Sequence, residues 1–245
     1  MARSARKRAS RAQSRQASRS EATDTKRAVE RAERGTAPPR PVFRSLRAYA
    51  FDPLLATQLE TADVNEVQLQ IPWEGDPVTG ASTLQPGPIG EYLEVIDVDP
   101  ASQRVYPPVD LDDPILLSER GLAPSEGNPK FHQQMVYGVA MTTIKIFEQA
   151  LGRVALWSPD RGKTGKGNQE FVQRLRIHPH ALREANAYYS PDKKALLFGY
   201  FPASSEQPGL NLPGGTVFTC LSHDIIAHET THALLDGMHR RFLEP

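Results

Sequence analysis

Apolar residues recur along this chain with two different periods, which together predict an α+β fold. Val67, Leu69 and Ile71 alternate with polar neighbours, as expected of a half-buried β-strand. Between residues 131 and 151 the apolar spacing changes to three and four, and Gly152 follows as a stop signal. The residues that carry this helical period are Met135, Val136, Val139, Ala140, Thr143, Ile144, Phe147 and Leu151. The pattern therefore predicts a β-rich region followed by one long helix.

After that helix the pattern returns to short β-prone runs and then predicts a final helix. Residues 171–177, "FVQRLRI", are strand-like, and residues 185–201 contain two β-prone runs joined by Ser-Pro-Asp, which predicts a hairpin. Residues 216–220 form another short strand-like run. Ser222 can serve as the N-cap of a helix that contains "DIIAHETTHALLDGMH".

Composition divides the chain into three predicted regions. Residues 1–34 hold eleven Lys and Arg against four Asp and Glu, and they contain almost nothing to bury, so we expect residues 1–40 to be a disordered basic tail. Residues 41–129 are rich in Pro and Gly, with short β-leaning pieces, which indicates a compact, loop-heavy region. Residues 130–245 contain both predicted helices and the hairpin.

The string His228-Glu229-Thr-Thr-His232 has the spacing of a zinc site. Residues four apart on a helix lie one above the other, so the two imidazoles can point at the same metal ion, and zinc accepts nitrogen ligands at about 2.0–2.1 Å. Glu229 is turned by about 100° from His228, which suits it to take a proton from water rather than to join the pair. An ordinary amphipathic helix with two histidines is the alternative.

This motif, preceded by "NAYYSPDKKALLFGY", resembles the thermolysin-like gluzincin metallopeptidases over about residues 131–242. The resemblance implies an α+β zincin lobe and hydrolysis of a peptide or protein substrate. It also implies Zn²⁺ held by His228 and His232, with Glu229 as the general base. By the same resemblance, Asn186, Ala187 and Tyr188 lie on the strand that binds substrate; a simple turn entry into a hairpin is the alternative for Asn186 and Ala187.

A catalytic zinc normally has three protein ligands. In gluzincins the third is a Glu on a later helix, and only 13 residues follow His232, so the resemblance implies a fragment without the C-terminal helical lobe. His239 lies about 16 Å along the helix axis from His228, which makes it a poor substitute, and Glu244 is the other local alternative.

Several further residues have two interpretations. Asp236 and Asp224 each lie four residues from a ligand histidine and could orient its imidazole, whereas Asp224 is also a typical first-turn acid. We interpret His178 and His180 as structural or surface residues, and Cys220 as a core residue. Because Cys220 is the only cysteine, an intramolecular disulfide is excluded.

The basic residues 1–34 support a second hypothesis, in which the chain is a catalytically inert module that binds polyanions through this tail. The chain has no apolar run of membrane-spanning length, and its first residues lack the apolar centre of a secretory signal. We therefore expect a cytoplasmic protein, with organellar targeting as an alternative.

Overall fold

The computed structural model describes residues 42–242, apart from 59, 62–63, 77–78, 160–169, 207–208 and 210. Residues 1–40 and 41–245 are separate units, and all the described residues belong to the second unit. The predicted basic tail and Glu244 lie outside the described residues. Within the described part, the architecture is mixed α+β, as predicted. None of its helices is both long and apolar enough to cross a membrane.

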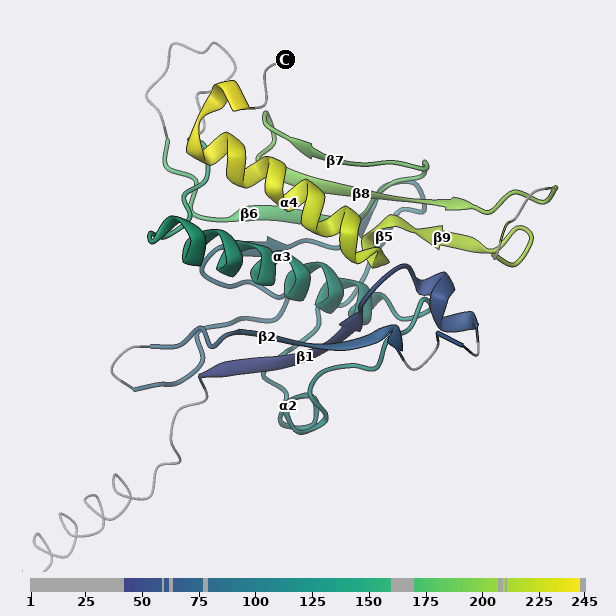
Figure 1. The fold of residues 1–245 in the computed structure, drawn as a ribbon, viewed down its shortest axis with the longest axis horizontal. Coiled ribbons are helices and arrows are strands. Elements are labelled where there is room, and N and C mark those ends of the chain that lie inside the picture. Colours follow the sequence, from purple (N-terminus) through teal and green to yellow (C-terminus); the bar gives the residue numbers. More distant parts are fainter. Residues whose placement is uncertain are drawn as a thin grey trace, which may run out of the picture. The chain divides into compact units, whose positions relative to one another are not determined.

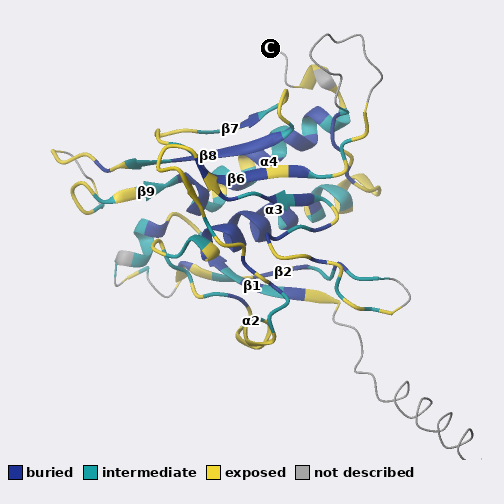
Figure 2. Ribbon diagram, turned by 180° about the vertical axis from the view of Figure 1, so that it is seen from behind, coloured by how far each residue is buried: buried dark blue, intermediate teal, exposed yellow. Residues whose placement is uncertain are grey.

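The sheet with the most strands in the described part is a mixed five-stranded one, which lies on the opposite side of α3 from β1 and β2 (Figure 1). Strand β6 (Leu175–Leu182) lies between β3 (Leu93–Val95) and β8 (Ala195–Pro202) and is parallel to both. Strand β7 (Ala187–Ser190) is antiparallel to β8 and ends the row, while β9 (Thr216–Phe218) pairs with the last residues of β8. Residues 195–199 of β8 are all buried, as expected of a continuous apolar run in a central strand (Figure 2).

The predicted hairpin is confirmed as β7 and β8, joined by a turn over residues 191–194. Gly199 allows the chain before β7 to approach β8 closely. A Cβ at this position would lie 2.3 Å from the Glu184 carbonyl oxygen and 2.7 Å from the Asn186 carbonyl oxygen. The Gly199 amide instead donates a 2.9 Å hydrogen bond to that Asn186 oxygen, which sets where the edge strand begins.

Helix α3 (Pro129–Leu151) confirms the predicted long helix, and Gly152 ends it in the left-handed conformation. Asn128 caps its first turn by accepting from the Lys130 amide. All residues from 131 to 141 are buried, because this part of the helix is covered on several sides. Helix α4 (His223–Met238) and the hairpin of β1 (Phe43–Tyr49) and β2 (Glu66–Pro72) both contact it.

The alternation predicted around Val67 is confirmed, since Leu69 and Ile71 of β2 are buried while their polar neighbours are exposed. A Cβ on Gly138 of α3 would lie 3.1 Å from Leu69 Cδ1, so glycine lets the hairpin approach the helix. Shorter elements complete the described part: η1 (Pro53–Thr57), β4 (Val98–Asp99), β5 (Arg104–Val105), α2 (Pro114–Glu119), η3 (Thr219–Leu221) and η4 (Arg240–Phe242).

Candidate metal centres

Helix α4 brings His228, Glu229 and His232 together. The two Nε2 atoms are 3.0 Å apart, and one carboxylate oxygen of Glu229 lies within 4.8 Å of both histidine ligand atoms. Tetrahedral zinc with nitrogen at about 2.0–2.1 Å requires a nitrogen separation of about 3.3 Å, so the pair needs to open only slightly. His228 is exposed, His232 is half-buried and Glu229 is buried. The group thus fits a metal ion bound on the accessible side of the helix.

Glu229 is held in place by the edge strand. Its Oε2 accepts a 2.9 Å hydrogen bond from the backbone amide of Tyr189 in β7. Seven residues later on the same face of α4, Asp236 accepts from the Tyr189 hydroxyl at 2.8 Å and pairs with Lys194 Nζ at 3.1 Å. Tyr189 therefore joins the hairpin to two turns of α4, through its amide and through its hydroxyl, and the carboxylate of Glu229 has a defined position.

The direction of the Tyr189 amide determines which groups β7 presents at its open edge. In an antiparallel pair, alternate residues direct their main-chain groups toward the partner strand. Asn186 directs its carbonyl to β8, whereas Tyr189 directs its amide away from β8 toward Glu229. Ala187 is two residues from Tyr189, so its amide and carbonyl point the same way as those of Tyr189, toward the open edge of β7. Tyr188, the third predicted substrate-binding residue, directs its main-chain groups toward β8 as Asn186 does, and the residue is 36% exposed.

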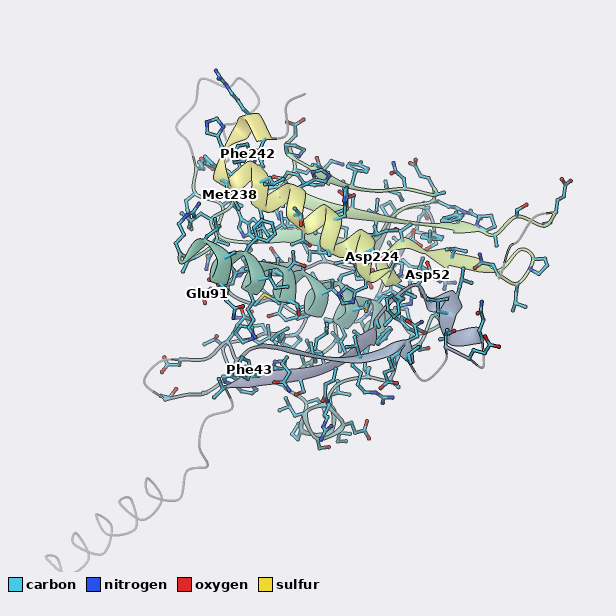
Figure 3. All side chains as sticks on the ribbon, viewed as in Figure 1. Phe43, Asp52, Glu91, Asp224, Met238 and Phe242 are labelled. Atoms are coloured by element: carbon cyan, nitrogen blue, oxygen red, sulfur yellow. The ribbon has the colours of Figure 1, made fainter. Side chains whose placement is uncertain are left out.

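The two aspartates of α4 have different surroundings. The hydrogen-bond partners of Asp236 among the described residues are Tyr189 and Lys194, so its carboxylate positions the hairpin rather than a ligand imidazole. Asp224 is an exposed acid in the first turn of α4, at the end opposite Met238 (Figure 3).

Ser222 occupies the predicted N-cap position of α4, but its side chain makes no capping hydrogen bond. His239 is exposed beyond the helix, with its ring against Phe242.

A second group of metal-ligand type lies in the interior, and sequence reasoning missed it. His132 of α3, His180 of β6 and Cys220 of η3 have ligand atoms within 4.8 Å of one another, and all three are buried. Cys220 thus lies in the core, as predicted. Strand β6 continues through Pro179 and carries His180 into the interior, so His180 is a buried residue and not a surface one.

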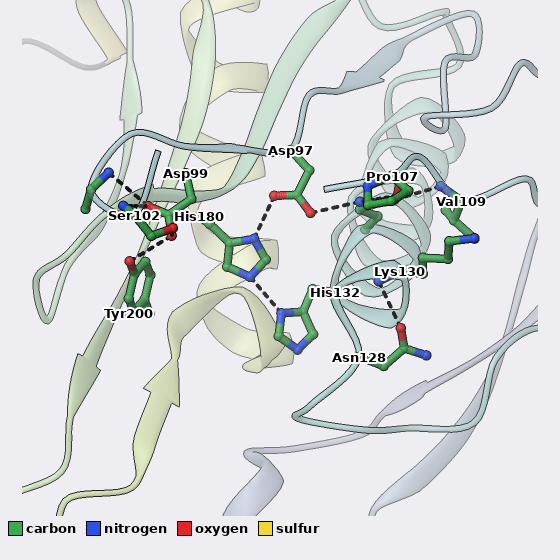
Figure 4. A network of polar contacts seen from close by, with 12 residues as sticks. Asp97, Asp99, Ser102, Pro107, Val109, Asn128, Lys130, His132, His180 and Tyr200 are labelled. Atoms are coloured by element: carbon green, nitrogen blue, oxygen red, sulfur yellow. Dashed lines mark hydrogen bonds and ion pairs between the residues drawn. The ribbon is translucent and has the colours of Figure 1, made fainter. Parts of the chain in front are cut away.

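Hydrogen bonds hold both buried imidazoles (Figure 4). His180 Nδ1 donates to Asp97 Oδ1 at 2.6 Å, and His132 Nε2 donates to the Glu126 carbonyl oxygen at 2.9 Å. Their other ring nitrogens face each other at 2.8 Å. Burial, and secondarily the neighbouring His180, lower the pKa of His132 to about 4. Burial likewise raises the pKa of the Cys220 thiol well above its ordinary value.

No family model, curated protein or solved structure matches this chain.

Proposed function

We propose that this protein is a zinc-dependent endopeptidase of gluzincin type, with the site on α4 and β7. The observation that carries the proposal is the arrangement of two converging, accessible imidazoles next to a buried carboxylate that an edge strand holds in place. If the helix carried these residues by chance, there would be no reason for the edge strand to hold the glutamate. In this structure the Tyr189 amide of β7 does hold it. The family resemblance of the motif and of the preceding hairpin supports the same class.

His228 and His232 would hold the zinc ion through their Nε2 atoms. When bound, zinc acts as a Lewis acid and lowers the pKa of coordinated water to about 7. Glu229 would then remove a proton from the attacking water and return it to the leaving amine. The Tyr189 amide supports this role because it fixes one carboxylate oxygen of Glu229 and leaves the other oxygen available for the proton. A catalytic zinc would need a third protein ligand. In the described part of the chain, this group contains only His228, His232 and the proposed base Glu229.

An extended substrate would lie along the open edge of β7. Main-chain hydrogen bonds from such an edge hold a peptide independently of its side chains. Ala187 offers its amide and carbonyl there, on the side of the strand that faces Glu229. Asn186 and Tyr188 would contribute to binding mainly through their side chains, because their main-chain groups have the parity that faces β8. This arrangement would bring the scissile carbonyl near the histidine pair.

The decisive variant is Glu229→Gln in the full-length protein. Glutamine has the shape of glutamate and can still accept from the Tyr189 amide, but it cannot act as the proton acceptor. We expect proteolysis of an unstructured protein substrate to fall by at least about 100-fold, in line with the contribution of general acid-base catalysis. The zinc content should remain that of the wild type.

The matched control is Glu184→Gln, which makes the same chemical change at an exposed position before β7. It should leave both proteolysis and zinc content unchanged. A second variant, His228→Ala combined with His232→Ala, should lose the zinc of this site. Proteolysis that survives Glu229→Gln would overturn the proposed mechanism, and wild-type protein without zinc would overturn the proposed site.

A further inference from the structure

The buried group of His132, His180 and Cys220 has the organisation of a metal site rather than of ordinary core packing. The three side chains come from α3, β6 and η3, which are separated by 48 and 40 residues along the chain. His132 is 1% exposed, His180 is 2% exposed and Cys220 is 0% exposed. Two imidazoles and a thiol are expensive to bury without partners, so this convergence in the interior requires a specific physical reason.

The outer nitrogen of each imidazole already has an acceptor. Asp97 accepts from His180 Nδ1, and it is itself held by the Gln133 amide, which donates to Asp97 Oδ2 at 2.8 Å. The Glu126 carbonyl oxygen accepts from His132 Nε2. A carboxylate or a backbone carbonyl on the distal nitrogen is the usual support of a metal-bound histidine, because it fixes the tautomer and the ring orientation. Both histidines have this support.

The two inner nitrogens, His132 Nδ1 and His180 Nε2, then have no hydrogen to share between them. A neutral imidazole that donates through its outer nitrogen presents a lone pair at its inner nitrogen. His132 Nδ1 and His180 Nε2 would therefore direct two lone pairs at each other across 2.8 Å. A proton or a metal ion must lie between them. The sulfur of Cys220, within 4.8 Å of one ring nitrogen of each histidine, is a third donor for a metal ion but would add nothing to a shared proton.

We infer that His132, His180 and Cys220 bind a second zinc ion, at a structural site separate from the accessible His228–His232 pair. Two nitrogens and one thiolate form a donor set that zinc prefers. The two nitrogens need to separate by about 0.5 Å to reach the 3.3 Å that tetrahedral zinc requires. Water would complete the coordination, because the group has three members among the described residues.

Aromatic rings lie against both histidines of this site, whose three side chains are buried. The Phe218 ring centre is 4.7 Å from that of His132 and 5.6 Å from that of His180, and the Tyr106 ring centre is 4.9 Å from that of His180. The bound ion would connect α3 and β6 to η3, which ends one residue before the N-cap of α4. Its role is therefore to fix where the helix that carries His228 begins.

The wild-type chain provides a direct test, because Cys220 is its only cysteine. X-ray absorption at the zinc edge of the zinc-loaded chain should contain a sulfur scatterer at about 2.3 Å. After replacement of zinc by cobalt, the spectrum should contain a thiolate-to-cobalt charge-transfer band. The wild-type measurement requires no variant, so it does not depend on whether a mutant folds.

Two variants assign the band to its site and separate this inference from the proposed peptidase. Cys220→Ala should lose the band and a full equivalent of metal, with circular dichroism confirming that it folds. The double variant His228→Ala, His232→Ala should retain the band. If the double variant held as much metal as the wild type, the peptidase site would be refuted and the buried site would stand. Zinc- and cobalt-loaded wild-type protein without any metal–sulfur signal would overturn the buried site and would favour a shared proton between the imidazoles.

Discussion

Replacement of Gly199 by alanine should destabilise the protein by displacing the start of the edge strand. The added Cβ would lie 2.3 Å from the Glu184 carbonyl oxygen and 2.7 Å from the Asn186 carbonyl oxygen, whereas ordinary contacts begin at 3.4 Å. Both obstructing atoms belong to the backbone, so residues 184–186 must move by about 1 Å to restore ordinary contact distances. That movement lengthens the hydrogen bond from the Gly199 amide to the Asn186 carbonyl oxygen.

Overpacking of this kind costs roughly 1–3 kcal/mol. For a domain of about 200 residues, each 1 kcal/mol shifts the melting temperature by roughly 2–4 °C, so we expect a decrease of roughly 2–12 °C. Thermal unfolding followed by circular dichroism measures this change. Because β7 also holds Glu229 and presents Ala187, the substrate-binding step of proteolysis should weaken together with stability.

Gly127→Ala is the matched control for this substitution. A Cβ at Gly127 has no neighbour within 4 Å, and the residue has no positive φ. Its replacement should be neutral or stabilise the chain by roughly 0.4–1 kcal/mol, because alanine reduces the entropy of the unfolded state. If Gly199→Ala melted at the same temperature as the wild type, the close approach of residues 184–186 to β8 would be wrong.

Three further substitutions test individual contacts in the described part of the chain, each by chemical denaturation. Phe198→Ala removes a fully buried ring from β8 and should cost roughly 3–5 kcal/mol, so an unchanged midpoint would contradict its central position. Asp236→Asn weakens the ion pair with Lys194, and the expected loss is roughly 1–3 kcal/mol, with a reduced salt dependence as the accompanying sign. Tyr137→Phe removes the hydroxyl donor to the buried Glu74 and should cost roughly 1–3 kcal/mol; a more stable variant would show that this hydrogen bond is unfavourable.

Local patterns were sufficient to predict the long helix α3 and the hairpin of β7 and β8. The helical period from residue 131, the stop at Gly152 and the hairpin around the Ser-Pro-Asp turn are all present in the structure. These features depend on interactions between residues that are close in the chain, so the sequence records them directly. The convergence of His228 and His232 was predictable for the same reason, since one helical turn relates the two residues.

Contacts between distant segments were not predictable from these patterns. Nothing near Glu229 in the chain indicates that its carboxylate accepts from the Tyr189 amide, or that Asp236 contacts the hairpin instead of a histidine. The buried group is the clearest example, because His132, His180 and Cys220 have no shared local spacing. Their proximity arises when α3 packs against β6 and η3, and long-range packing of that kind leaves no periodic signal in a single sequence.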